Sequence, residues 1–300
     1  MPNSLGGINL AQIAQESLKV LSPKLVLLKN FTRDFSSDIA VNGQSVTTRV
    51  ATDEDADDVS GGFSASDATS TPYTITLNQE LGKVKGFTQK ELSLGGMDLL
   101  RRTFFPSMVN AVGKGVIKYC IGLMTNATFA NKTVITAGNF DADAVADLGG
   151  NLDALNVPDD NRSIIVQPAY TTNLVKDDTI QRVDASGSDM TLRESRIGHL
   201  HGFNISKFNA FPSSGTTNAE NLMGFACSNE GILIAARFPD VPDAANQVID
   251  VENVVEPESG FPMQFQLFYV PMDRKFYIAI ATLFGAQPGV PNNLWRIVSA

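Results

Sequence analysis

Three aspartates at alternating positions, Asp53, Asp55 and Asp57, have the spacing with which a calcium-binding loop begins. Such a loop needs a glycine at its sixth position for a sharp turn and a bidentate glutamate at its twelfth. Here the sixth position is Asp58 and the twelfth is Ser64. Because both required residues are missing, we interpret the acidic run as a solvated loop or an intermolecular contact, with a weak, adventitious divalent site as the alternative.

The two histidines of the chain, His199 and His201, form the sequence HLH. In an extended chain both imidazoles would lie on one face, which is how two ligands can begin a zinc site. No third ligand is indicated, and no motif supplies the nucleophile and the orienting acid that a catalytic triad needs beside its histidine. We therefore expect both histidines to be surface polar residues or to have their hydrogen bonds satisfied within the fold.

The remaining candidate residues lie in sequence contexts that do not fit a catalytic or ligand-binding site. Gly113-Lys114-Gly115 lacks the earlier glycine and the following Ser or Thr of a phosphate-binding loop, and it falls inside a predicted helix. Asp159-Asp160 and Asp177-Asp178 lie in turn regions, where solvated or capping roles are expected. Cys120 lies among apolar helix positions and is expected in the core. The sequence thus predicts no catalytic, cofactor-binding or metal-binding residues.

Composition narrows the class of protein. The 300 residues exceed the usual size of a single core, so about two domains are expected. A net charge of −9 argues against wrapping around nucleic-acid phosphates. The two cysteines have no CxxC spacing, and the longest apolar run, Phe276 to Ala286, is too short to span a bilayer. The start has no signal-peptide pattern, and we expect a soluble protein made inside cells.

The stretch from Ala51 to Thr74 is rich in acids and contains no Lys or Arg. The segments Ser45–Val50 and Tyr73–Leu77 have strand patterning, so this acidic stretch joins two strands. A hairpin loop usually has two to five residues, and roughly twenty polar ones predict a long finger that becomes ordered on another molecule. Its acids are Asp53, Glu54, Asp55, Asp57, Asp58 and Asp67.

Helical spacing predicts a long helix within Met97 to Ala127, and Pro106 should kink it or stand in the first turn of its main segment. A shorter amphipathic helix is expected from Leu10 to Leu21, before Pro23. A helix from Asp141 that stops before Pro158, a strand at SIIVQP (163–168) and a helix at AYTTNLVKD (169–177) begin an alternation that predicts a mixed α+β lobe over about Phe140 to Ala245. The tail predicts two strands joined by a turn near residues 271–274, which would pair with the early strands.

This order of parts, together with local phrases, resembles the major capsid protein family of tailed bacteriophages, whose Johnson fold is shared with encapsulins. KVKGFTQKELSLGGMDLL is similar to the family's strand that leads into its spine helix. NVPDDNRSIIVQPAYTTNLVKDD is similar to a segment of its axial domain. IGHLHGFNISKFNAFP and GFACSNEGILIAARFPD resemble later axial strands and the segment before the chain returns to the peripheral domain.

The resemblance implies an α+β fold of four parts. These are an N-terminal arm (1–40), an extended hairpin called the E-loop (41–86), a peripheral domain with the spine helix (87–139 and 246–300) and an axial α+β domain (140–245). The six acids would lie at the E-loop tip and contact the next subunit. Some relatives crosslink subunits through an E-loop Lys, but the first Lys after Ala51 is Lys83, so the crosslink is not expected.

The resemblance further implies a structural protein rather than an enzyme. Its copies would form pentamers and hexamers of an icosahedral head that encloses double-stranded DNA without reading its sequence. A scaffolding protein, a portal and a cement protein are the implied partners, with no membrane and no cofactor, and the protein would be part of the virion after assembly in the host cytoplasm. An encapsulin-like compartment and an oligomeric α+β enzyme are the alternatives.

Overall fold

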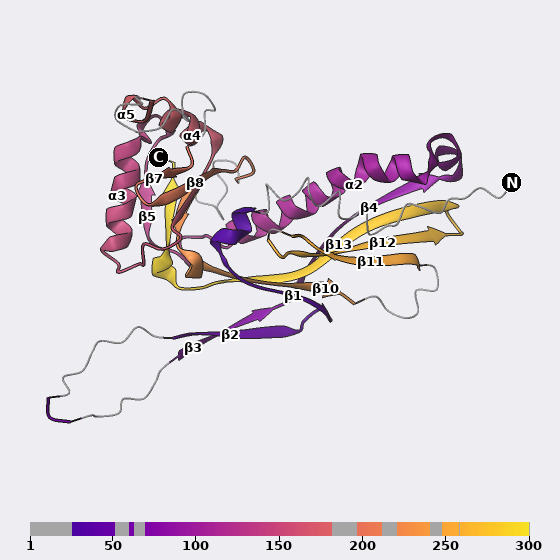
Figure 1. Cartoon of the computed structure of the whole chain (residues 1–300), viewed down its shortest axis with the longest axis horizontal. Helices are drawn as coiled ribbons and strands as arrows, with labels where there is room; N and C mark the ends of the chain where they lie inside the picture. Colours follow the sequence, from indigo (N-terminus) through magenta and orange to yellow (C-terminus); the bar gives the residue numbers. More distant parts are fainter. Residues whose placement is uncertain are drawn as a thin grey trace.

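The computed structural model describes residues 26–51, 60–62, 70–181, 197–211, 221–240, 248–257 and 259–299. The described chain contains two six-stranded sheets, a two-stranded hairpin and one long helix (Figure 1). The predicted α+β class is therefore confirmed. The helix expected from Leu10 to Leu21 lies outside the described residues.

The first sheet is built around its longest strand, β13. Leu283 of β13 pairs with both Arg237 of β10 and Glu80 of β4, so β10 and β4 lie on opposite sides of β13. The strand order is β1-β10-β13-β12-β11, with β4 as the additional neighbour of β13. The strands are β1 (Thr32–Ala40), β4 (Gln79–Thr88), β10 (Ile232–Pro239), β11 (Val248–Val255), β12 (Pro262–Val270) and β13 (Lys275–Pro288).

The second sheet carries the shorter strands and has the order β5-β14-β9-β6-β8-β7. The strand predicted at SIIVQP is confirmed as the central strand β6, all four residues of which are buried. The last strand, β14, brings the C-terminal part of the chain into this sheet. The strands are β5 (Lys132–Val134), β6 (Ser163–Val166), β7 (His199–Leu200), β8 (Phe203–Lys207), β9 (Leu222–Cys227) and β14 (Leu294–Val298).

The long helix α2 (Gln89–Gly122) begins eight residues before the predicted Met97. Thr88 and Glu91 form a capping box: the Thr88 backbone N–H donates to Glu91 Oε2 at 2.8 Å, and the Glu91 N–H donates to Thr88 Oγ1 at 3.4 Å. The hydrogen bonds that the Thr88 N–H and the Thr88 hydroxyl donate to the Glu91 carboxylate hold the pKa of Glu91 below its ordinary value. Pro106 lies inside α2, which excludes the first-turn alternative; the kink stays a prediction.

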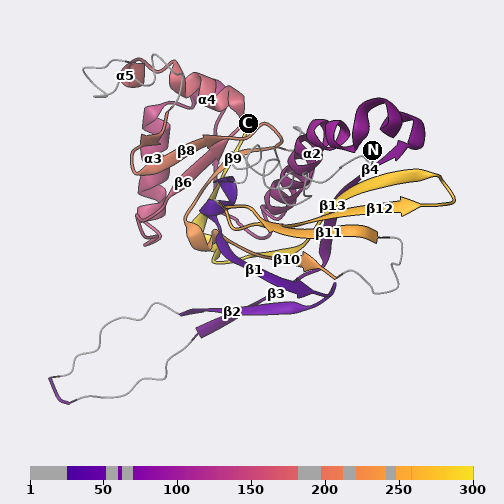
Figure 2. The same cartoon turned by 45° about the vertical axis from the view of Figure 1, so that its right-hand side comes forward.

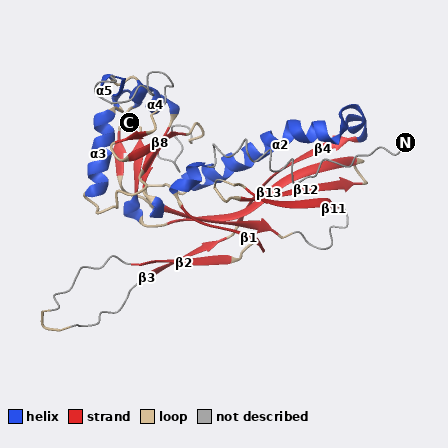
Figure 3. Ribbon diagram, in the orientation of Figure 1, coloured by secondary structure: helices blue, strands red, loops and turns tan. Residues whose placement is uncertain are grey.

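Three shorter helices accompany the second sheet: α3 (Ala142–Asp153), α4 (Pro168–Val175) and α5 (Asp178–Gln181). The helices predicted at 141–155 and 169–177 are confirmed as α3 and α4. Single 3-10 turns lie between the larger elements: η1 (Val26–Asn30), η2 (Ala137–Asn139), η3 (Asn229–Gly231) and η4 (Pro291–Asn293). The buried side chains of α3 and α4 pack on one face of the second sheet (Figure 3).

The two faces of the first sheet carry different layers. On β13, Ile278 and Ile280 contribute to the core beneath α2, whereas Leu283 contributes to a separate core beneath the hairpin. On β10, Ile234 lies in the first of these cores and Leu233 in the second. This alternation is the strand period of two. The helix α2 and the hairpin therefore cover opposite faces of one sheet, as both views of the molecule show (Figures 1 and 2).

The two strands predicted in the tail are confirmed as β12 and β13, which pair antiparallel, and β13 pairs with the early strand β4 as expected. The sheets do not follow the predicted domain boundaries throughout. β10 falls within 140–245 but belongs to the first sheet, because it pairs with β1 and β13. β5 and β14 fall outside that range but belong to the second sheet. The division into four domains stays a prediction.

Candidate assembly surfaces

The hairpin of β2 (Ser45–Ala51) and β3 (Ser70–Thr76) flanks the acidic stretch. The two strands pair antiparallel in continuous register from Ser45↔Thr76 to Ala51↔Ser70, which confirms the predicted strands and their pairing. The six acids proposed to contact another subunit, Asp53, Glu54, Asp55, Asp57, Asp58 and Asp67, lie outside the described residues. Their role stays a prediction.

The base of the hairpin is fixed to the first sheet. Ile75 and Leu77 are buried in a small core with Leu233, Ala235 and Leu283. The backbone N–H of Leu77 donates to Gln44 O at 2.8 Å, and the N–H of Gly43 donates to Leu77 O at 2.8 Å, so two bonds close the base. The direction in which the hairpin leaves the body is therefore set by side-chain packing and by backbone hydrogen bonds.

A glycine of the sheet lets the hairpin approach this closely. A Cβ atom at Gly285 of β13 would lie 2.1 Å from the carbonyl oxygen of Thr76, which is far inside van der Waals contact. Any side chain at this position must therefore push strand β3 away from strand β13.

The face of the first sheet on the hairpin side is uncovered away from the hairpin base, within the described part of the chain. Phe268 of β12 and Tyr277 of β13 stack there with ring centroids 5.3 Å apart. Val84 of β4 and Val251 and Val255 of β11 are exposed. In a monomer this leaves valines and partly buried aromatic rings in water, which is a feature of surfaces that bind another protein.

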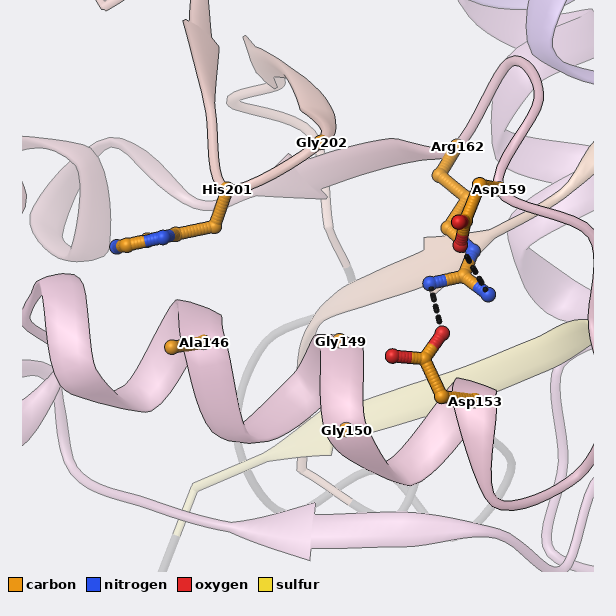
Figure 4. A pocket seen from close by; sticks show the side chains of 8 residues that line it. All are labelled: Ala146, Gly149, Gly150, Asp153, Asp159, Arg162, His201 and Gly202. Atoms are coloured by element: carbon orange, nitrogen blue, oxygen red, sulfur yellow. Dashed lines mark ion pairs between the residues drawn. The ribbon is translucent and has the colours of Figure 1, made fainter.

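A polar pocket lies between α3 and the turn that joins β7 to β8 (Figure 4). The side chain of Arg162, only 5% exposed, lies at one end, where it makes ion pairs with Asp153 at 2.7 Å and Asp159 at 2.9 Å. Its Nε donates to Pro158 O at 3.0 Å and its Nη2 donates to Val157 O. The lining residues are Ala146, Gly149, Gly150, Asp153, Asp159, Arg162, His201 and Gly202.

The contacts of Arg162 give this pocket a structural explanation. All of the guanidinium's partners lie between residues 153 and 159, so the arginine holds the connection between α3 and β6 in place. His201 lies toward the opposite end of the pocket, above Ala146 (Figure 4). Apart from the ion pairs of Arg162, no two polar side chains among the residues that line this pocket lie within hydrogen-bond distance of each other.

The histidine pair does not have the extended geometry that a zinc site would need. His199 is in β7, but His201 has a φ of 47° and Gly202 a φ of 82°, so these two residues form the turn of the β7–β8 hairpin. Among the described residues, no group of three or more His, Cys, Asp or Glu is placed to hold a metal ion.

The other polar candidates have structural roles. Asp177 Oδ2 accepts from the Ala142 N–H at 2.8 Å at the N-terminus of α3, and its Oδ1 accepts from the Thr179 N–H at 2.9 Å. Burial by itself raises the pKa of Asp177, but the hydrogen bonds from Thr179 and Ala142 outweigh it and hold the pKa below its ordinary value. The predicted capping role is thus confirmed for Asp177.

Both cysteines are free and buried, as predicted for Cys120. Burial raises the pKa of each thiol to about 12, so neither is a nucleophile near neutral pH. Gly113 to Gly115 lie within α2, where no phosphate-binding loop can form. None of the helices in the described ranges has the length and apolar character that crossing a membrane requires.

Sequence reasoning missed a buried cation that joins the segment after α2 to the second sheet. Arg296 of β14 is fully buried; its Nε donates to Phe129 O at 2.7 Å and its Nη2 donates to Asn126 Oδ1 at 2.6 Å. These contacts attach the segment after α2 to the second sheet. The only signal in the sequence is an arginine inside the apolar strand LWRIV, which would be costly to bury unless its donors were satisfied.

No family model and no curated protein sequence matches the chain. Solved structures do match it over most of its length. A chain in the capsid structure of the cyanophage P-SCSP1u aligns with a TM-score of 0.60 and 12% identity, over 90% of this chain and 86% of that chain. A chain of Mycobacterium phage Che8 aligns with a TM-score of 0.55 and 16% identity, over 85% and 84%.

A virus-like particle from Pyrococcus furiosus also matches, with a TM-score of 0.51 and 14% identity over 95% of this chain and 98% of that chain. At these identities the likeness concerns the fold. It extends over most of the molecule, because 85% or more of the chain is aligned in each case. The chain therefore has the capsid-shell fold, the Johnson fold that tailed-phage major capsid proteins share with encapsulins.

Proposed function

We propose that this chain is the major capsid protein of a tailed bacteriophage, a structural subunit that assembles into pentamers and hexamers of an icosahedral head around double-stranded DNA. The observation that supports the proposal is the fold itself, which matches chains of a phage capsid and of a virus-like particle over 90% and 95% of this chain. It is supported by an uncovered sheet face beside a hairpin that leaves the body of the molecule. The subunit performs no catalysis in this proposal.

In the assembly that we propose, the hairpin of one copy lies across the uncovered sheet face of the next copy. Covering Val84, Val251 and Val255 would remove apolar area from water, at roughly 25 cal/mol per Å² of buried surface. The acids from Asp53 to Asp67 would meet basic side chains of the neighbour, and charge complementarity would fix the register of the contact more than its affinity. Each copy gives a hairpin and receives one, which is the head-to-tail arrangement that closes rings.

Other components belong to the same proposal. A scaffolding protein guides assembly, a portal occupies one vertex and a cement protein adds strength where noncovalent overlap is insufficient. The DNA is enclosed without sequence recognition, and the subunit becomes part of the virion after assembly in the host cytoplasm. The absence of Lys between residues 51 and 82 supports overlap without a hairpin crosslink.

An encapsulin-like compartment is the second candidate. It is favoured by the match to the Pyrococcus furiosus particle, which covers 98% of that chain. The two candidates differ in their contents: a head contains DNA, whereas a compartment contains an enzyme. Genes for a portal and a packaging motor beside this one would favour the head, and a gene for a cargo enzyme would favour the compartment.

The hairpin tip provides the test of this proposal. Deletion of Asp53 to Asp67 should give a folded subunit that fails to form closed shells, because the neighbour is no longer reached. Negative-stain electron microscopy of the purified product measures the outcome. A variant in which the same acids become Asn or Gln keeps the length and should form shells with more irregular particles. Normal shells from the deletion would contradict the assignment of the tip.

A further inference from the structure

Charge is distributed unevenly along the chain in a way that matches the layers of the fold. From Leu99 to Phe140 the sequence has no Asp or Glu, although the whole chain has a net charge of −9. The bases of this acid-free segment are Arg101, Arg102, Lys114, Lys118 and Lys132, and all except Lys132 belong to α2. The acidic stretch, in contrast, is inserted in the hairpin.

The outward side of α2 presents part of this charge to solvent. Lys114 and Lys118 are exposed and stand four residues apart, so they are neighbours on one helical face. The opposite side of the helix is buried in the core, with Val112 and Val116 at the same level. The exposed positions around the lysines are small or polar, including Ser107. Two cations therefore stand on a solvated face without a neighbouring carboxylate in their helix.

A third lysine flanks this face. Leu81 of strand β4 reaches Gly115 of α2, and Lys85 Nζ lies 4.3 Å above the ring of Phe104. Lys83 lies between these two residues on the same side of the strand, and it is exposed. We call the set Lys83, Lys114 and Lys118 the α2 lysine face.

The arrangement of layers decides what this face can meet in a shell. The α2 lysine face and the hairpin lie on opposite sides of the first sheet. In a closed shell one subunit thick, symmetry axes run through the shell wall, so every copy turns the same face outward. A neighbour's hairpin therefore stays on the hairpin side, and its acids cannot neutralise the lysines of α2. The partner of the lysines must come from the other side of the wall.

We propose that the α2 lysine face lines the inside of the shell and contacts the backbone phosphates of the enclosed double-stranded DNA. This inference rests on the proposed function. Lysine ammonium groups bind phosphates as point charges and carry no sequence information, which suits a container for any DNA sequence. Only a few contacts per subunit are formed, so binding stays weak and depends strongly on salt. The hairpin acids would then lie at the outer surface.

The test uses shells of the full chain, assembled with a labelled DNA duplex of about 30 base pairs and then treated with nuclease to remove DNA outside. The protected DNA per shell is measured by fluorescence across a series of salt concentrations. The variant is Lys114→Gln with Lys118→Gln. The matched control is Lys176→Gln with Lys207→Gln, which removes the same charge from two exposed lysines beside the second sheet.

Wild-type shells assembled at low salt should protect DNA, and shells assembled at higher salt should protect progressively less. In the double variant the slope of log retention against log salt should fall by about 1.8, since each phosphate contact contributes about 0.9. Each single substitution should lower this slope by about half as much. The variant Lys114→Arg with Lys118→Arg should have the wild-type slope. The control should leave the slope unchanged.

Several results would overturn the inference. These are equal retention by the double variant and the wild type, an equal loss in the control, and electron microscopy that places α2 on the outer surface of the shell. Shells that protect no duplex at low salt would also overturn it. Failure of the proposed function is a separate result, because in that case the wild-type chain forms no closed shells under any condition tested.

Discussion

At the scale of single residues, the polar groups that first suggest chemistry instead hold connections in place. Asp177 caps α3 from a distant turn, Arg162 fixes the segment between α3 and β6, and Arg296 attaches the end of α2 to the second sheet. The hydrogen-bond and ion-pair partners of these three side chains belong to the same chain. A reaction centre needs groups that are aimed at a substrate, whereas these side chains bind backbone and side-chain groups of their own chain.

Asp177 gives the prediction at this scale. Replacement by Asn should lower the free energy of unfolding by about 1 kcal/mol at pH 7, because a charged cap of α3 is lost. The folded-state pKa of Asp177 lies below the ordinary 3.8, so its stabilisation is present above that pH and is lost as pH falls through the folded pKa. The difference in the free energy of unfolding between Asp177→Asn and wild type should therefore become smaller in acid.

Thermal unfolding from pH 7 to pH 3 measures this difference. Asp178→Asn is the matched control, since it removes a neighbouring exposed carboxylate for which no cap to α3 is observed. The charged-cap explanation would be contradicted if the difference in stability between Asp177→Asn and wild type stayed constant over this pH range. An equal effect of the control substitution would also contradict it.

At the scale of elements, the base of the hairpin is the feature on which the proposed assembly depends. Gly285→Ala would place a methyl group where the Thr76 carbonyl now lies, so β3 must move away from β13. We expect a loss of about 1–3 kcal/mol in urea unfolding, as for other overpacked sites. The substitution should accelerate amide hydrogen exchange more in strand β3 than in strand β12.

Gly122→Ala serves as the control for this substitution. Its Cβ would meet nothing within 4 Å at the end of α2, so stability should change by less than about 1 kcal/mol. Unchanged exchange in β3 after Gly285→Ala would mean that the hairpin is not held by this close contact.

Elements with strong local patterns were predictable from the sequence, and those defined by distant pairing were not. The tail strands, α3 and the strand at SIIVQP follow from apolar periodicity. The early start of α2 was also readable, since Thr88 and Glu91 have capping-box spacing, but it was missed. Strand β1 was not predicted, because its segment TRDFSSDIA is polar and its register shifts between Phe35 and Ile39; its place comes from parallel pairing with β10.

The histidine motif shows how one dihedral angle changes a site prediction. The zinc hypothesis required HLH to be extended, but His201 and Gly202 both have positive φ and form a two-residue hairpin turn. The dipeptide His-Gly between two short strands was the available signal. The acids from Asp53 to Asp67 lie outside the described residues, so their predicted contact with another subunit stays a prediction.

At the scale of the whole molecule, identity of 10–16% to solved shell proteins preserves the fold but no fixed set of residues. Within this fold, the described part of the chain layers the helix α2, the first sheet and the hairpin on one another. In the proposed assembly, the uncovered sheet face and the projecting hairpin would be the two halves of one contact between neighbouring copies. The layering also places the α2 lysine face on the side of the first sheet opposite to the hairpin.

The central claim is that the hairpin of each copy lies on the first sheet of the next copy in a closed shell. Electron cryomicroscopy of particles formed by the purified full-length chain tests it most directly. We predict icosahedral shells in which the hairpin β2–β3 crosses the neighbouring face that contains Phe268, Tyr277 and Val84. Single copies in solution, or shells in which each hairpin contacts only its own subunit, would contradict the account.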